Sequence, residues 1–330
     1  MADNSLQIEL FNQIKSLLPP HLSMVETIGS LLNVSADSVY RRIRGEKPLP
    51  LEELKILCEH FQLSLDHVLQ VYSDKIVFTD PEVLQPVNNY KDYLKSVHDS
   101  LKFFNSFGKR ELMYLSKDVP IFHFFISKEL AAFKSFFWSR SILNEPGFDS
   151  MKFSVDDQLD DEIWQMTQNV LIEYNTIPSV ELWNLESISS TTAQIEFYRD
   201  AGIFKTKNDL NKVVDSLHVM LEHLEKQVER GVKFVPGTSG DNSPTSLKFF
   251  VNELILGNNS IMVELDGNRH AFLNYIVLKY ISTSDVKFTT KMFDNFYNLR
   301  NRSIMISETG ERERVRFFNK LKERVEACRI

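Results

Sequence analysis

Cysteine is scarce in this chain, and the marks of a secreted protein are missing. Two cysteines, Cys58 and Cys328, occur among 330 residues. They are too few for a disulfide framework, and their spacing does not suggest a metal site. The N-terminal stretch MADNSLQIELFNQIK lacks the basic start and the apolar run of a secretory signal. We therefore expect a cytoplasmic protein, in a compartment that keeps thiols reduced.

A long hydrophobic run is also missing. The most apolar window, residues 121–138 (IFHFFISKELAAFKSFFW), contains His123, Lys128, Glu129 and Lys134. These are too many polar groups for a stretch barely long enough to span a bilayer. The window therefore predicts a buried element and no membrane partner. Its aromatic side chains could line an internal ligand pocket, although aromatic residues at helical spacing usually form core.

Excess positive charge is absent as well. The formal net charge is −7, so the whole chain is not a polycation that would coat nucleic acid or an anionic membrane. Any contact with DNA must therefore come from a local basic patch.

The chain lacks the short motifs of common enzymes and cofactor sites. It has no P-loop, no G-x-S-x-G and no dinucleotide fingerprint. His218 and His223 are five residues apart, which places them on different faces of a helix, so we interpret them as solvated rather than as a zinc pair. The acidic run at 156–162 is better explained by charge at a helix start than by a divalent metal. We expect no enzymatic activity and no cofactor, with an enzyme of unrecognised motif as an open alternative.

Helical spacing of apolar residues dominates the first 72 residues. It predicts five short helices, at 5–18, 24–32, 36–44, 51–61 and 64–71. Ser23 and Ser35 stand where helix N-caps are needed, and Gly45 ends the third helix. We therefore expect a compact all-α domain over 1–72.

The remainder of the chain is predicted to be larger and less regular. Residues 73–89 contain two prolines and little helical period, which indicates a linker. We expect an α-rich middle region at 90–235, with a short strand or two at 110–125. The stretches SLKFFVNELIL, NSIMVELDG and HAFLNYIVLKYI predict an antiparallel meander in an α+β module at 247–330. The two regions could also share one domain, and the predicted fold class is mainly α.

The second and third helices have the layout of a helix-turn-helix. Two helices that cross closely need a small residue in the first, and Gly29 is small. The turn needs a residue that tolerates positive φ, and Asn33 does so. At roughly 100° per residue, Val39 and Ile43 face the core.

The same phasing gives the three arginines of RRIR different roles. Asp37, Arg41 and Arg44 point away from the core, and Ser38 and Tyr40 flank them. Arg42 lies nearer the buried edge. An arginine fork can donate two hydrogen bonds to a guanine edge or a phosphate.

Lys47 and Ser23, at the start of the second helix, could meet backbone phosphates. A lone basic string is more often a solvated helix face. Here it occupies the correct helix of the unit, which favours DNA binding.

The stretch SMVETIGSLLNVSADSVYRRIRGEKPLPLEELKILCEHFQLSLDHVL resembles the Cro/C1-type (XRE-like) helix-turn-helix family. The resemblance covers about the first seventy residues and implies a lambda-repressor-like domain. It also implies that five residues face bases, which are Ala36, Asp37, Ser38, Tyr40 and Arg41. Arg44 matches a phosphate-contacting position. Gly29 and Asn33 depart from the alanine and glycine that the family usually has there.

Together these features predict a sequence-specific transcriptional regulator. One recognition helix contacts only a few base pairs, so we expect a homodimer on a palindromic double-stranded operator. The C-terminal region would supply dimerisation and respond to an unknown small-molecule or protein effector. The alternative is an interaction or effector component, as in a toxin-antitoxin or defence system, that uses its helical N-terminal domain for docking.

Overall fold

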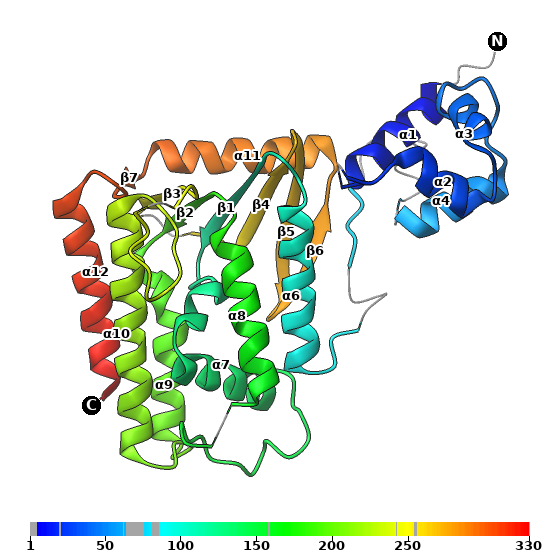
Figure 1. The fold of residues 1–330 in the computed structure, drawn as a ribbon. Helices are drawn as coiled ribbons and strands as arrows, with labels where there is room; N and C mark the ends of the chain where they lie inside the picture. Colours follow the sequence, from blue (N-terminus) through cyan, green and yellow to red (C-terminus); the bar gives the residue numbers. More distant parts are fainter. Residues whose placement is uncertain are drawn as a thin grey trace.

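The computed structural model describes residues 5–19, 21–61, 63, 76–80, 86–157, 159–241, 243–253 and 256–329. Figure 1 shows a small helical bundle followed by a larger part built around one sheet. The fifth helix predicted at 64–71 lies outside the described residues, and so do parts of the predicted linker at 73–89.

The N-terminal bundle contains four described helices that match the predicted ones closely. They are α1 (Ser5–Leu17), α2 (Met24–Leu32), α3 (Ala36–Ile43) and α4 (Leu51–Phe61). Their apolar positions recur at helical spacing and meet in one core of fully buried side chains, which are Leu10, Phe11, Ile14, Ile28, Val39 and Leu57.

The larger part is built on a seven-stranded mixed sheet in the order β6-β5-β4-β1-β2-β3-β7. Strands β1, β2 and β3 are parallel, and the other pairs are antiparallel. The strands are β1 (Arg110–Ser116), β2 (Ser179–Trp183), β3 (Leu247–Val251), β4 (Ser260–Leu265), β5 (Asn268–Ile276), β6 (Lys279–Thr283) and β7 (Ile304–Met305).

The predicted fold class is therefore correct only in part, because the helices pack on a seven-stranded mixed sheet and the fold is mixed α/β rather than mainly α. The reason lies in the two central strands. The last five residues of β1 and all five of β2 are buried, because helices cover both faces of the sheet. Such strands are too short to be distinguished by pattern from buried helix. The strand β2, SVELW, alternates polar and apolar residues over only four positions, and it was not predicted.

The predicted meander is correct for β4, β5 and β6, which form consecutive antiparallel pairs. Asp266 and Gly267 make the first turn, with φ of 47° and 89°, as a two-residue hairpin requires. The stretch HAFLNYIVLKYI forms two strands rather than one. The first predicted stretch belongs elsewhere, because β3 pairs in parallel with β2.

Helices cover the two faces of the sheet unequally (Figure 1). Alternate residues of β1 face opposite cores, so Leu112 and Tyr114 join the larger one while Met113 and Leu115 pack with α11. The predicted helices in this part are confirmed as α6 (Tyr90–Asn105), α7 (Lys128–Ser141), α8 (Asp161–Asn175), α9 (Ser189–Asp200), α10 (Lys207–Arg230), α11 (Val286–Asn301) and α12 (Glu311–Glu326). The described residues also form the short 3₁₀ helices η2 (Ile121–Ile126), η3 (Leu185–Ile188) and η4 (Ala327–Arg329).

A single sheet therefore joins residues from both predicted regions, since β1 and β2 come from 90–235 and the other five strands from 247–330. Within the described part of the chain, no helix is long and apolar enough to cross a membrane.

Residues 76–80 lie along the β6 edge of this sheet. Thr79 and Ser282 exchange two backbone hydrogen bonds of 2.7 and 2.9 Å. The Thr283 hydroxyl donates to the Val77 carbonyl at 2.7 Å, and the Tyr275 hydroxyl donates to Asp80 at 2.8 Å. The segment that follows the helical bundle is thus attached to the β5–β6 hairpin.

Candidate functional site

The turn between α2 and α3 has the geometry that the sequence predicts. A Cβ on Gly29 would lie 3.2 Å from the Val34 carbonyl oxygen, tighter than an ordinary van der Waals contact. Asn33 adopts the left-handed conformation with φ of 52°, and the hydroxyls of Ser23 and Ser35 cap α2 and α3. These features hold α3 against the bundle at one angle.

Most of the predicted base-facing residues share the outer surface of α3. Ala36, Asp37, Tyr40 and Arg41 are exposed, and the Tyr40 side chain is 50% exposed despite its aromatic ring. Ser38 is half-buried. Ser23, Arg44 and Lys47, the predicted phosphate contacts, are also exposed.

Arg42 belongs to the interior of the bundle. Its side chain is 2% exposed, and its Nε and Nη2 donate to the two carboxylate oxygens of Glu53 on α4, at 2.6 and 2.7 Å. Its Nη1 donates to the carbonyl of Ser38 at 3.1 Å and also to the Ser38 hydroxyl. Arg42 therefore holds α3 against α4. It also donates a hydrogen bond to the hydroxyl of Ser38, which was predicted to face bases.

Arg44 has a partner of its own on the surface. Its Nε and Nη2 donate to Glu46 at 2.6 and 3.0 Å, and this hydrogen bonding lowers the pKa of the Glu46 carboxyl. Four of the six lysines and arginines of residues 1–72 lie between Arg41 and Lys47, against nine acidic residues in the same range. The basic surface is therefore small, and a phosphate would have to displace Glu46.

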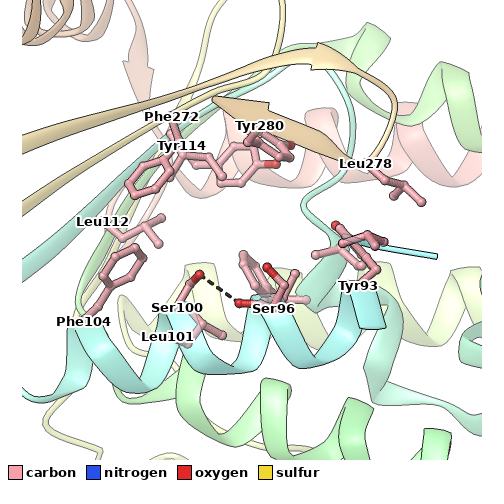
Figure 2. A pocket seen from close by; sticks show the side chains of 15 residues that line it. Tyr93, Ser96, Ser100, Leu101, Phe104, Leu112, Tyr114, Phe272, Leu278 and Tyr280 are labelled. Carbon is pink, nitrogen blue, oxygen red and sulfur yellow. Dashed lines mark hydrogen bonds between the residues drawn. The ribbon is translucent and has the colours of Figure 1, made fainter. Parts of the chain in front are cut away.

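The α/β part contains a second candidate site, an apolar cavity between α6 and the sheet (Figure 2). Its volume is about 870 Å³, with the open mouth included. Leucine, phenylalanine and tyrosine side chains from α6, β1, β5, the β5–β6 turn and β6 line most of it, including Leu101, Phe104, Leu112, Tyr114, Phe272 and Tyr280. Residues 121–138, where the sequence allowed a pocket, contribute Ile121 and Phe122.

A more polar chamber adjoins this cavity. Five residues belong to both linings, which are Tyr93, Tyr114, Ile121, Leu278 and Tyr280. Asp118 follows β1, Ser190 and Thr191 follow β2, and Asn259 precedes the antiparallel β4. The chamber therefore opens beyond the carboxyl ends of two parallel strands, where ligands commonly bind in α/β folds.

Lys134 on α7 is the buried charge of this chamber. It is 2% exposed, and its ammonium donates to the Thr191 hydroxyl at 2.9 Å and to the side-chain amide oxygen of Gln194 at 2.7 Å. The nitrogen lies 4.1 Å from the centroid of the Phe124 ring. Burial lowers the pKa of Lys134 to about 7, although the charge of Asp118 opposes this shift. Lys134 was not among the site residues predicted from the sequence. Its position among the apolar residues of FKSFFW was the only indication that it could be buried.

We expect Lys134 to make stability depend on pH. The unfolded lysine titrates near 10.5 and the folded one near 7, so between these values the unfolded chain binds about one more proton. Stability therefore rises with pH across this window, by roughly 1.4 kcal/mol per unit. Lys134→Met should remove this contribution. Urea unfolding of both proteins at pH 8, 9 and 10 measures it, and a difference in unfolding free energy that stays constant with pH would contradict it.

A second buried ionic cluster lies within the core. Glu181 on β2 is fully buried and accepts hydrogen bonds from the Trp183 indole at 2.8 Å and from the Tyr174 hydroxyl. His123 Nε2 lies 3.2 Å from the same carboxylate. The Lys233 ammonium donates to the Tyr174 carbonyl at 3.1 Å and lies 3.3 Å from the ring centroid. These groups satisfy one another, so we interpret the cluster as structural.

The two helix histidines have separate partners. His218 lies 3.0 Å from Glu326, and His223 lies 3.0 Å from the carbonyl of Phe234. Burial lowers the pKa of His223 to about 4, so the interpretation of this residue as solvated is wrong. Across the described ranges, no group of three or more His, Cys, Asp and Glu side chains is arranged to hold a metal ion.

Comparison with known proteins found no relative. No protein-family model matches the chain, and no curated protein or solved structure matches it either.

Proposed function

We propose that the protein is a sequence-specific DNA-binding transcriptional regulator that acts as a homodimer, with the N-terminal bundle as its operator-binding domain. The observation that carries the proposal is the exposed face of α3. Arg41 and Tyr40 project from a helix that is held by a close crossing at Gly29, a left-handed turn at Asn33 and the buried Arg42–Glu53 pair. A helix presented this rigidly suits the major groove.

The division of labour among the polar residues follows from their positions. Arg41 lies on the exposed side of α3 and can present its fork to a guanine edge, with Ala36, Asp37 and Tyr40 beside it. Ser23 at the start of α2, Arg44 and Lys47 flank this face and suit phosphates. Ser38 keeps a supporting role, because its hydroxyl is bonded to Arg42.

The proposal predicts different effects for the substitutions Arg41→Ala and Lys47→Ala. Selection of random-sequence duplexes by the full chain should enrich a palindromic site. Arg41→Ala should weaken binding to that site by about 10- to 100-fold and relax one base position. Lys47→Ala should weaken binding to all sequences alike and make the slope of log affinity against log salt shallower by about one. Titration of labelled duplex at several salt concentrations measures both effects.

Lys55→Ala provides the matched control, because Lys55 is 73% exposed and pairs with Glu59 on α4. It should leave affinity unchanged. Thermal unfolding should show that all three variants are folded like the parent protein. The proposal fails if two results are obtained together: selection enriches no sequence, and the protein at micromolar concentration retards no duplex.

The alternative function, docking to another protein, has its own supporting observation. Acidic residues outnumber basic ones in residues 1–72, and Glu46 neutralises Arg44. A bundle that binds a protein partner would show the opposite result in the selection experiment, with no enriched duplex. Its affinity for that partner would also survive Arg41→Ala and Lys47→Ala together.

A further inference from the structure

The apolar cavity and the polar chamber make one elongated site with two chemically different ends. Figure 2 shows Phe104, Leu112 and Phe272 at one end of the apolar cavity, and Leu278 and Tyr93 at the other. Leu278 and Tyr93 also line the polar chamber. The polar chamber therefore adjoins the end that lies opposite Phe104. A molecule that filled both would have an apolar body and a polar head.

The polar end contains a cation that lacks a counterion. Within the described part of the chain, no carboxylate oxygen lies within 4 Å of the Lys134 ammonium, whose hydrogen bonds go to the neutral oxygens of Thr191 and Gln194. Asp118 lines the same chamber, but its carboxylate accepts from Ser190 and from Asn259. A buried charge is costly unless it is paired, so the chamber favours an anionic guest.

The number of cations limits the charge of that guest. Among the described residues of both linings, Lys134 is the single basic side chain. A phosphate or a dicarboxylate would bring a second negative charge with no partner, close to Asp118. One carboxylate matches one ammonium.

We infer that this site binds an amphipathic monocarboxylate, with its hydrocarbon body between α6 and the sheet and its carboxylate against Lys134. The protein–ligand ion pair would be formed in a buried place, where it is screened little by salt. Tyr114 and Tyr280 lie at the junction of the two chambers and would contact the carbons next to the carboxylate.

The position of the site also suggests what the ligand would do. The β5–β6 hairpin supplies Leu278 and Tyr280 to the cavity wall, and the same hairpin bonds to residues 76–80 through Thr79 and Asp80. A ligand that moves the hairpin would therefore move the segment that leads to the DNA-binding bundle. This consequence for DNA rests on the proposed function, whereas binding of the ligand does not.

Titration calorimetry of the full chain with decanoate tests the inference. Decanoate should bind saturably with a 1:1 ratio and at least about tenfold more tightly than decanol, which has the same chain without the charge. Lys134→Met should weaken decanoate by about tenfold or more and abolish the preference over decanol. Lys128→Met on the same helix is the control, because Lys128 is 45% exposed and pairs with Asp161, and it should change neither affinity.

Proton uptake gives a second reading that depends on Lys134. With its pKa at about 7, roughly nine tenths of the free protein holds a neutral lysine at pH 8, and a bound carboxylate would restore the charge. Binding at pH 8 should therefore take up close to one proton, measured in buffers of different ionisation enthalpy, and at pH 6 almost none. Lys134→Met should take up none at either pH.

A third variant tests the apolar end without touching the charge. Ser96→Phe places a ring in the cavity from the α6 side, where Ser96 lines it, and should weaken decanoate and decanol alike. No saturable decanoate binding by the parent protein would overturn the inference, and so would equal binding by Lys134→Met. Neither result would contradict the proposal that the N-terminal bundle binds DNA, which the selection of duplexes tests separately.

Discussion

Glu181→Gln should destabilise the α/β part by about 3 kcal/mol, which is the largest effect that we expect from a single isosteric change. Burial alone would raise the pKa of Glu181, but His123, Lys233 and Tyr174 stabilise its ionised form and bring the pKa down to about 2. Removing this charge leaves His123 and Lys233 buried without their anion. In a part of this size, the melting temperature should fall by roughly 6–12 °C.

Glu111→Gln is the matched control, because the same chemical change on the neighbouring strand should not destabilise the protein. Glu111 lies on β1, and burial raises the pKa of its carboxyl above the ordinary value. Its ionised form is therefore disfavoured by folding, and the neutral amide should be neutral or slightly stabilising at pH 7. Equal destabilisation by both substitutions would show that shape rather than charge decides the effect at Glu181.

The pH dependence of Glu181→Gln gives an independent check. A carboxyl whose folded pKa lies below its unfolded value stabilises the protein fully above the unfolded pKa. Its contribution is lost as pH falls from about 4.5 towards 2. The difference between the parent protein and Glu181→Gln should therefore shrink over this range in urea unfolding experiments.

The sequence predicted local structure well where each element makes its own pattern. The four described N-terminal helices and their caps could be recognised from apolar spacing and from Ser23, Asn33 and Ser35. The seven helices of the α/β part could be recognised in the same way. The strand β2 could not, because it has only five residues and its polar side chains Ser179 and Glu181 are buried like the apolar ones. Pairing of β3 with β2 depends on partners about 70 residues apart, which no local pattern encodes.

The candidate sites differ in the same respect. The face of α3 is local, so helical phasing was enough to separate exposed Arg41 from buried Arg42. The cavity is assembled from α6, β1, β5 and residues 121–138, and its charge comes from Lys134 with partners on α9. Sequence suggested aromatic residues around a pocket. It placed Lys134 among apolar residues but did not show that the lysine lies buried beside the pocket, because the depth of a side chain is set by tertiary packing.

Glu53→Ala should unfold the N-terminal bundle while leaving the α/β part intact. The substitution leaves Arg42 2% exposed and without an anion, which costs about 3–5 kcal/mol, and a bundle with six fully buried core side chains has little more than that to lose. Hydrogen exchange in residues 24–61 should become fast, and DNA binding should be lost although Glu53 lies on α4, away from the face of α3.

Glu52→Ala is the control for this change, since Glu52 is the exposed neighbour and its removal should keep the amides protected. Replacing both partners, with Arg42→Met and Glu53→Leu, should restore protection, because an apolar pair needs no counterion. Restored protection together with restored DNA binding would show that Arg42 acts by holding α3 in place. Protection without binding would instead show that the apolar pair does not hold α3 in the arrangement that DNA binding requires.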